Sequence, residues 1–282
     1  MKVVHTLPLL IREQHRQFDL EMALSALTTL ARSGERRVVL YNQGSLPNEE
    51  LDAITVAAGV EAVVLGSGVN IGIAQARQAC FDYIWSHLPQ TAYISEVHVD
   101  MLFPPSWHAP LIDYLERSGE PMACPGILTA SGELQPLGEW IPPPPDAPAI
   151  LERLAELPRS GVRAGFVHPV IHRAAALRAV GGYPVREMPG KQGYEDDALL
   201  LAYHYYMGTR VDWRPVCVLG SWVYHATMAQ RMSLPGKEAE FQVNERALVR
   251  QYGVQGLRRL EHIHGRPAAF AHLGDPDRGN EG

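Results

Sequence analysis

Cysteine is scarce in this sequence of 282 residues, which contains only three. Cys80, Cys124 and Cys217 lie far apart and form neither a Cys-x-x-Cys pair nor a zinc-knuckle spacing. A disulfide framework is therefore not expected, and a reducing compartment is favoured.

The chain also lacks a surplus of basic residues, since it has 25 Lys and Arg against 31 Asp and Glu, a formal net charge of −6. A broad nucleic-acid-binding face needs excess cations and is disfavoured, although a local basic pocket for one nucleotide is not.

No stretch reaches the roughly 18 apolar residues of a membrane span, and the first residues do not form a signal peptide. We expect a cytoplasmic protein with no nucleic-acid partner and no integral membrane segment.

Three common catalytic motifs are missing as well: the Gly-x-Ser-x-Gly elbow, the P-loop and His-Glu-x-x-His. Their absence disfavours the usual hydrolase, NTPase and zincin readings. What the chain does have is 46% apolar residues, 25 Gly, 22 Pro and 12 His. This composition indicates a cored protein with many structured loops, which is where chemistry tends to lie.

The first half alternates strand and helix signals. Apolar runs predict strands at 3–10, 37–41, 61–65 and 93–100, and helical spacing predicts helices at 18–31, 48–58 and 73–87, with Asn48 as a cap. Single helices between strands imply right-handed crossovers and a mainly parallel sheet. Ligands bind beyond the carboxyl ends of such strands, which here are residues 42–45, 66–72 and 98–100.

The second half is less regular. Helices are predicted at 111–117 and 148–157, strands at 121–127 and 164–172, and a stiff spacer at the four prolines 142–145. The tail from 265 is rich in Gly, Asp, Pro and Arg, so we expect it to be frayed. One α/β domain with a variable second half fits these signals better than two independent domains.

A glycine-containing loop opens the helix predicted at 73–87. Free N–H groups at a helix N-terminus favour an anion, and Arg77 lies in its first two turns, beyond Asn70 and Gly72. The simpler alternative is a strand-to-helix turn with a surface arginine. A third reading is a dinucleotide fingerprint, because Gly66-x-Gly68-x-x-x-Gly72 is followed by an acidic residue, but the loop follows the third strand rather than the first.

The strand predicted at 93–100 ends in Glu96-x-His98-x-Asp100. Side chains two apart on a strand share a face, so these three groups would converge and suit a divalent cation such as Mn²⁺. His225, at the end of a later apolar strand, could complete the metal shell. The alternatives are a polar edge strand and an ordinary surface histidine.

Three consecutive carboxylates, Glu195, Asp196 and Asp197, precede a helix predicted to begin near Ala198. They serve either as caps that complement the helix dipole or as the source of a general base at a pocket mouth. A sharp turn, Gly181-Gly182-Tyr183-Pro184, comes before them. His168 and His172 flank Pro169 and are interpreted as structural or acceptor-site histidines.

The order of these segments resembles the family 2-like glycosyltransferases of the GT-A fold, over about Val3 to Ser233. The matching segments are Asn70-x-Gly72-x-x-x-Ala76-Arg77, His98-Val99-Asp100 with Pro104-Pro105-x-Trp107, Gly181-Gly182-Tyr183, Gly193-Tyr194-Glu195-Asp196-Asp197, and His225. The sequence departs from the family in having His98 in place of the first Asp of Asp-x-Asp, Asn42 in place of a base-contacting Asp, and Glu195-Asp196-Asp197-Ala198-Leu199 in place of Glu-Asp-x-Asp-Leu.

The resemblance implies a GT-A domain over 1–264, with a nucleotide-sugar-binding half (1–107), an acceptor-binding half (108–264) and a flexible tail (265–282). It implies an inverting transfer from a nucleoside-diphosphate sugar to an acceptor hydroxyl, with Asp196 or Glu195 as base and Mn²⁺ or Mg²⁺ at Asp100, His98 and His225. The residues expected near the donor are Thr6, Pro8, Asn42, Asn70, Gly72, Arg77 and His98.

The acceptor is expected over Trp140, Trp222 and Tyr194, whose flat rings suit sugars. A saccharide, a peptide, a lipid-linked molecule and a small molecule all remain open as its class, and so does a homodimer. Two other functions stay open: a sugar-nucleotide-binding protein of the same fold that has lost catalysis, and an NAD(P)-dependent oxidoreductase built on Gly66 to Gly72.

Overall fold

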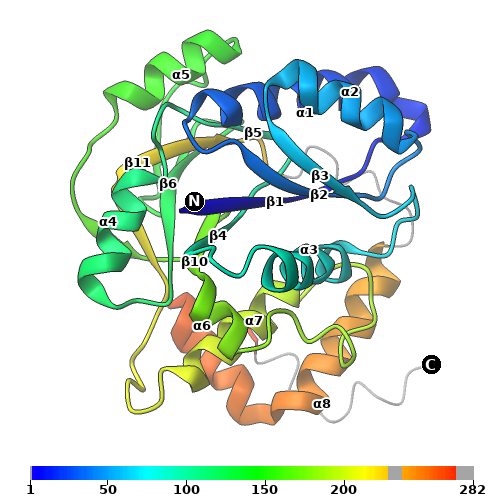
Figure 1. The fold of residues 1–282 in the computed structure, drawn as a ribbon. Coiled ribbons are helices and arrows are strands. Elements are labelled where there is room, and N and C mark those ends of the chain that lie inside the picture. The colour runs from blue at the N-terminus through cyan, green and yellow to red at the C-terminus, as the bar shows by residue number, and fades with distance from the viewer. Residues whose placement is uncertain (1, 228–236, 271–282) are drawn as a thin grey trace.

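The computed structural model describes residues 2–227 and 237–270 (Figure 1). Its first part alternates strands with helices: β1 (Val3–Leu9), the short 3-10 helix η1 (Glu13–His15), α1 (Arg16–Arg32), β2 (Arg37–Asn42), α2 (Asn48–Ala58), β3 (Glu61–Leu65), α3 (Ile73–His87) and β4 (Tyr93–Glu96). The strands and helices predicted for this part are all present, and α3 has the predicted ends.

The second part contains shorter and less regular elements. They are β5 (Met101–Leu102), α4 (Ala109–Ser118), β6 (Met122–Thr129), β7 (Glu133–Gln135), β8 (Glu139–Trp140), α5 (Ala147–Glu156), β9 (Val162–Ala164), β10 (Val170–Arg173), α6 (Ala174–Ala179), α7 (Glu195–Tyr206), β11 (Val216–His225) and α8 (Lys237–His264), which is kinked at Gly253. No helix was predicted at α8 from the sequence.

One mixed sheet joins the two parts, in the order β3-β2-β1-β4-β10-β6-β11-β5. β3, β2, β1 and β4 are parallel, and so are β6 and β11, whereas β10 runs antiparallel to β4 and β6. The sheet is therefore mainly parallel and flanked by helices, as predicted.

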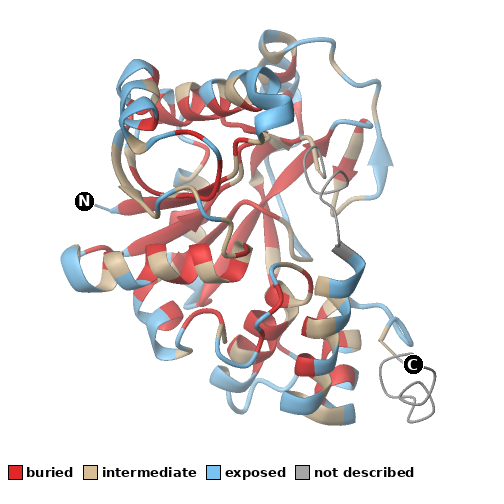
Figure 2. Ribbon diagram, turned by 90° about the vertical axis from the view of Figure 1, so that its right-hand side faces the viewer, coloured by how far each residue is buried: buried red, intermediate tan, exposed pale blue. Residues whose placement is uncertain are grey.

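Helices cover both faces of the sheet, which is buried between them (Figures 1 and 2). Successive residues of β1 face opposite ways: Val3 and Leu7 join the cluster under α1, α2 and α4, and Val4 joins the cluster under α3, α6, α7 and α8. A third, smaller cluster packs α5 against β11 through Ile150 and Trp222. No helix in the described ranges is both long and apolar enough to cross a membrane.

Two predicted strands differ in the structure. β4 ends at Glu96 rather than at residue 100, because the chain turns there to reach β5, which pairs with the distant β11. The strand predicted at 164–172 is two strands, since β9 pairs with β11 whereas β10 pairs with β4 and β6. One continuous strand could not serve both sets of neighbours.

Helix starts also differ from the predictions. Asn48 does not cap α2, because its side chain accepts a hydrogen bond from Asn42 Nδ2 (2.7 Å) and donates to Gly66 O (3.0 Å); Pro47 occupies the cap position. α7 begins at Glu195, three residues before the predicted start. Of the predicted tail, residues 265–270 are described and 271–282 lie outside the described residues, as does Ser233, where the resemblance ends.

Candidate functional site

The candidate site lies where β4, β5 and β11 meet the start of α7. His98 and Asp100 lie between β4 and β5, and His225 is the last residue of β11. β11 runs antiparallel to β5 with His225 opposite Met101, and Ala226 N donates to Asp100 O at 2.9 Å. This register brings together side chains that are 125 residues apart.

His98, Asp100 and His225 form a cluster of possible metal ligands. His225 Nε2 lies 3.3 Å from His98 Nδ1 and 3.4 Å from Asp100 Oδ1, and the ligand atoms of all three residues lie within 4.8 Å of one another. The predicted grouping of these three residues is therefore confirmed. Glu96, which the alternation placed on the same face, is not part of the cluster, because the strand ends there and its carboxylate pairs with Arg77.

The hydrogen bonds of the cluster indicate which of its atoms could bind a cation. Arg77 Nη2 contacts His98 Nε2, and a guanidinium can only donate, so Nε2 accepts and the proton of the neutral ring lies on Nδ1. Nδ1 then donates to His225 Nε2, whose one lone pair accepts this hydrogen bond. His225 Nε2 also lies 3.4 Å from Asp100 Oδ1, so a cation between these two atoms would replace the hydrogen bond from His98. Asp100 and His225 are therefore the candidate direct ligands, and His98 could join them only when Arg77 releases Nε2.

Arg77 lies at the centre of a buried network, with 1% of its side chain exposed. Its Nη1 donates to Glu96 Oε2 and to Tyr183 Oη (3.0 Å), and lies 2.8 Å from His168 Nε2. The alternative of a surface arginine is therefore wrong for this residue. Through its contact with His98, Arg77 joins the cluster of His98, Asp100 and His225, which we call the metal-type cluster.

Glu96 is the ionised partner of Arg77 in this network. Burial alone would raise the pKa of the Glu96 carboxyl, but Arg77 and a hydrogen bond with His172 outweigh burial and lower that pKa to about 2. His172 Nε2 lies 2.7 Å from Glu96 Oε1, and the Tyr203 hydroxyl lies 2.8 Å from His172 Nδ1. Glu96 therefore stays charged over the physiological pH range.

Asp196, in the first turn of α7, is the partly exposed carboxylate at the edge of this buried network. One third of its side chain is exposed, and its Oδ1 accepts a hydrogen bond from the Tyr183 hydroxyl at 3.2 Å. Burial and the negative charges of Glu195, Glu96 and Asp197 raise the pKa of Asp196 to about 8, with Arg77 acting in the opposite direction. A carboxyl group with a pKa near neutrality suits general acid–base work.

The other two acidic residues of α7 have different surroundings. The Glu195 side chain is buried, whereas the Asp197 carboxylate lies 2.7 Å from His264 Nε2 at the end of α8. Of the three consecutive carboxylates, Asp196 is the one that combines partial exposure with contact to Arg77 and Tyr183.

The loop before α7 is held by its neighbours. Asn244 of α8 is buried, accepts a hydrogen bond from Gly190 N (2.7 Å) and donates to Gly193 O (2.9 Å). Tyr194 has a left-handed backbone (φ 61°), which costs about 1–3 kcal/mol for a residue with a side chain. The start of α7 is therefore fixed by α8 rather than by its own sequence.

Residues predicted near the donor lie on three loops or strands. Thr6 and Pro8 are buried within β1, and the Thr6 hydroxyl donates to Ser95 O (3.2 Å). Asn42 is buried and uses its amide inside its own loop, where it donates to Leu46 O (2.8 Å) and accepts from Gly44 N (3.0 Å).

The loop before α3 packs closely on the loop before α7. Asn70 Oδ1 accepts from Gly72 N (3.0 Å), and a Cβ at Gly72 would lie 2.6 Å from Lys191 Cα. Ile73 N, the first N–H of α3, donates to Lys191 O (2.9 Å), so this N–H is not free for an anion as the loop sequence suggested. The loop follows β3, the edge strand of the sheet.

The aromatic residues predicted to meet an acceptor also differ. Trp140 is 64% exposed and Tyr194 is half-buried, but Trp222 is 3% exposed and donates its indole N–H to Pro158 O at 2.6 Å. The prediction for Trp222 is therefore wrong, because its ring packs inside the cluster under α5.

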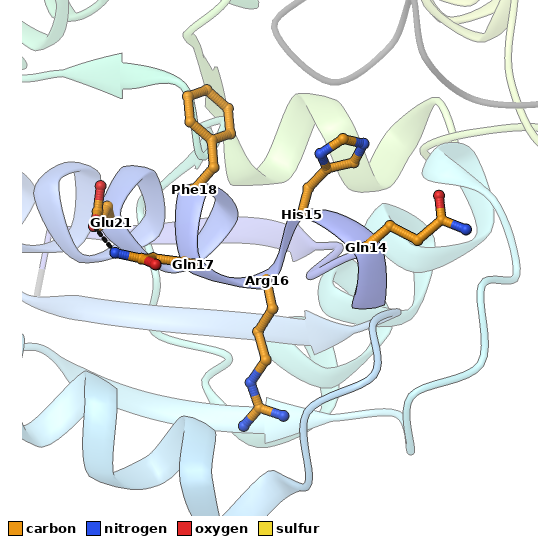
Figure 3. Close-up of a pocket in the computed structure, with 6 residues that line it drawn as sticks. All are labelled: Gln14, His15, Arg16, Gln17, Phe18 and Glu21. Atoms are coloured by element: carbon orange, nitrogen blue, oxygen red, sulfur yellow. Dashed lines mark hydrogen bonds between the residues drawn. The ribbon is translucent and has the colours of Figure 1, made fainter.

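A shallow hollow of about 350 Å³ lies at the start of α1, away from these residues in sequence (Figure 3). The residues that line it are Gln14, His15, Arg16, Gln17, Phe18 and Glu21, and Gln17 Nε2 donates to Glu21 Oε1 at 3.0 Å. No predicted site residue lines it.

The residues that connect the site were not predicted from the sequence. Tyr183 was noted only within the segment Gly181-Gly182-Tyr183, as a turn and as part of the family resemblance, and His172 and Tyr203 were not linked to Glu96. The only sequence signal for Tyr183 is its place directly after two glycines, which indicates a close backbone approach but not which groups the hydroxyl meets.

Comparison with known proteins gives a result for the fold only. No family model and no curated protein matches this sequence. Among solved structures, TarS from S. aureus superimposes with a TM-score of 0.54 and 11% identity over 96% of this chain, which spans 44% of the TarS chain. A TarS fragment (residues 1–349) in complex with UDP-GlcNAc gives a TM-score of 0.53 and 12% identity, covering 96% of this chain and 73% of the fragment.

A third structure comes from a different protein. GalNAc-T7 with UDP, GalNAc and Mn²⁺ superimposes with a TM-score of 0.53 and 15% identity over 79% of this chain and 43% of its own. TarS and GalNAc-T7 are glycosyltransferases of the GT-A fold. The chain therefore has the GT-A fold, as its sequence motifs predicted.

Proposed function

We propose that the protein is a glycosyltransferase that moves a sugar from a nucleoside-diphosphate sugar to an acceptor hydroxyl, with inversion at the anomeric carbon. The observation that carries this proposal is that a possible metal site and a possible general base lie close together in a GT-A fold. Arg77 contacts His98 of the metal-type cluster and lies 3.9 Å from the carboxylate of Asp196. The UDP and UDP-GlcNAc complexes of TarS and the UDP complex of GalNAc-T7 support a sugar-nucleotide donor.

Asp196 is the general base of the proposed reaction. Its ionised carboxylate accepts the proton of the acceptor hydroxyl while that oxygen attacks the anomeric carbon. With a pKa of about 8, the carboxyl is largely protonated at pH 7, so transfer should rise with pH across that value. Asp197 is less suited to this role, because His264 holds its carboxylate.

The cluster at the ends of β4 and β11 forms the donor side. A divalent cation held by Asp100 and His225 would supply the positive charge that stabilises a departing nucleoside diphosphate. Arg77 orients His98 beside these ligands. The loops that carry Asn42, Asn70 and Gly72, together with Thr6 and Pro8, are proposed to shape the nucleotide site.

Thermal unfolding with a panel of UDP-, GDP- and dTDP-sugars, each with and without Mn²⁺ or Mg²⁺, tests donor and metal binding. We expect one donor to raise the midpoint in a cation-dependent way. Asp100→Ala should abolish that dependence, and Asp113→Ala, an exposed carboxylate on α4, should keep it. An unchanged response in Asp100→Ala would contradict the metal assignment.

Donor hydrolysis in long incubations tests catalysis. Asp196→Asn should reduce turnover by about 10²–10⁴-fold while donor binding persists. A donor-binding protein without turnover is the second candidate, and the proton on His98 Nδ1 favours it, because His98 offers the cation no lone pair while Arg77 holds the ring. Donor stabilisation with no hydrolysis by the unaltered protein would support that candidate.

A further inference from the structure

We propose that Tyr183 is a positioning residue for Asp196, whose single hydroxyl proton turns between Glu96 and Asp196 as Asp196 gains or loses a proton. The catalytic meaning of this switch rests on the proposed function, in which Asp196 is the base. The switch itself is a property of the buried network and can be measured without any substrate.

The Tyr183 hydroxyl has three polar neighbours but only one proton. Arg77 Nη1 lies at 3.0 Å, Glu96 Oε2 at 2.8 Å and Asp196 Oδ1 at 3.2 Å. The guanidinium can only donate, so it occupies one lone pair of the hydroxyl oxygen. The proton can therefore serve one of the two carboxylates at a time.

Glu96 can give up that proton at little cost. Its carboxylate also accepts from Arg77 and lies 2.7 Å from His172 Nε2, so it keeps charged and polar partners when the hydroxyl turns away. Asp196 has no second hydrogen-bond donor among the described residues, since Arg77 at 3.9 Å and His168 at 3.8 Å are beyond hydrogen-bond distance. The hydroxyl thus matters more to ionised Asp196 than to Glu96.

Protonated Asp196 reverses the arrangement. The carboxyl proton of Asp196 then donates to the Tyr183 oxygen, and the hydroxyl donates to Glu96 at the shorter distance of 2.8 Å. Both carboxyl groups are hydrogen-bonded in both states, and no heavy atom has to move. Tyr183 itself does not titrate in this range, because burial and the charge of Glu96 hold its pKa well above the usual value.

The surrounding chain fixes the tyrosine for this role. Its ring stacks on Phe81 of α3 (centroids 5.8 Å apart, planes at 10°), and its backbone N–H donates to Gln78 Oε1 at 2.9 Å. The side chain of Gln78 occupies the space that a Cβ at Gly182 would need, which explains the glycine before the tyrosine. A hydroxyl held by α3 can select between partners on β4 and α7.

The groups that face Asp196 come from five parts of the chain. They are Glu195 and Asp197 on α7, Arg77 on α3, Glu96 on β4, and His168 and Tyr183 on the loops before β10 and α7. The acidic neighbours oppose ionisation, whereas Arg77 and the Tyr183 hydroxyl favour it. Removing the hydroxyl should therefore make Asp196 harder to ionise.

Carboxyl ¹³C NMR of the full chain, with Asp196→Asn to assign the Asp196 signal, tests this directly. Tyr183→Phe should move the Asp196 titration midpoint up by about one pH unit, a tenfold lower ionised fraction near neutral pH. The matched control is Tyr203→Phe, another buried tyrosine of the network, which meets His172 rather than Asp196 and should leave the midpoint unchanged. An unchanged midpoint in Tyr183→Phe would overturn the proposal.

A measurement on the unaltered protein covers the case in which Tyr183→Phe does not fold. The ¹³Cζ signal of Tyr183 should shift with the same midpoint as the Asp196 carboxyl, and Asp196→Asn should remove that shift. A Tyr183 signal that stays constant while Asp196 titrates would show that the hydroxyl does not turn.

Activity separates this inference from the proposed function. If the protein transfers sugar, Tyr183→Phe should lose about tenfold in kcat/KM at pH 7 and recover at high pH, whereas a merely structural loss would lower activity equally at every pH. If no donor is turned over but the NMR midpoint moves, the proposed function fails and the switch stands.

Discussion

Two buried polar regions lie on opposite faces of β1 and β4, and they are built in opposite ways. On the face under α3, Glu96 and Arg77 are ionised and bonded to each other. On the face under α1, His5 is completely buried beside Trp107, and neither of its ring nitrogens makes a hydrogen bond of good geometry among the described residues. The opposite facing follows from alternation along the strands.

The difference shows how this fold accommodates polar side chains in its interior. Charge is kept where a partner of opposite charge and further hydrogen bonds compensate for lost water. Without such partners the group stays neutral: burial, and then the neighbouring His108, lower the pKa of His5 to about 3. The first region can hold chemistry that depends on charge, whereas the second can only contribute packing.

Breaking the charged region should have the largest effect on stability. Arg77→Met leaves Glu96 as a buried carboxylate without its countercharge, and such losses cost about 3–5 kcal/mol in free energy of unfolding. Urea unfolding at pH 7 measures this. Arg37→Met, which removes an exposed bridge to Glu61, is the matched control and should cost at most about 1 kcal/mol. Equal losses in the two variants would refute the contrast.

The fold was largely predictable, because local patterns dictate it. Helical spacing predicted α3 at 73–87, and the apolar runs predicted β2 and β3 to within a residue. The errors fall where distant pairing decides the structure: β4 stops at Glu96 because the chain must reach β11, and the segment predicted at 164–172 divides between two sets of neighbours.

The site was predictable only in part. The strand-end motif and the histidine that ends the last strand indicated the cluster of His98, Asp100 and His225. The network beneath it was not predictable, because Arg77 meets Tyr183 across 106 residues, and no spacing in the sequence encodes that contact. The residue type of Trp222 did not predict its surroundings either, because its ring is buried and not exposed to a ligand.

Acid should destabilise the uncharged region. His5 has a folded-state pKa of about 3 against about 6.5 when unfolded, so the unfolded chain takes up the proton first as pH falls. Its contribution to stability is complete above pH 6.5 and is lost as pH falls from there towards 3, by up to about 1.4 kcal/mol per pH unit. Urea unfolding between pH 7 and 4.5 should show a shallower dependence in His5→Leu than in the unaltered protein. Identical slopes would mean that His5 does not carry this linkage.

Two neighbouring hydroxyls, one on each face of the sheet, allow the two regions to be compared through a single hydrogen bond. Thr6 and Ser95 lie on paired strands and are both buried, but Thr6 Oγ1 donates to Ser95 O at 3.2 Å, whereas Ser95 Oγ, on the face of His5, has no hydrogen-bond partner in the described part of the chain. Thr6→Val should cost about 1 kcal/mol in free energy of unfolding, because a satisfied hydrogen bond is lost at nearly constant shape. Ser95→Ala removes a hydroxyl that is desolvated without compensation, so its cost should be close to zero or negative. Urea unfolding of both variants measures the difference, and a larger loss for Ser95→Ala than for Thr6→Val would show that the second region holds a hydrogen bond to water.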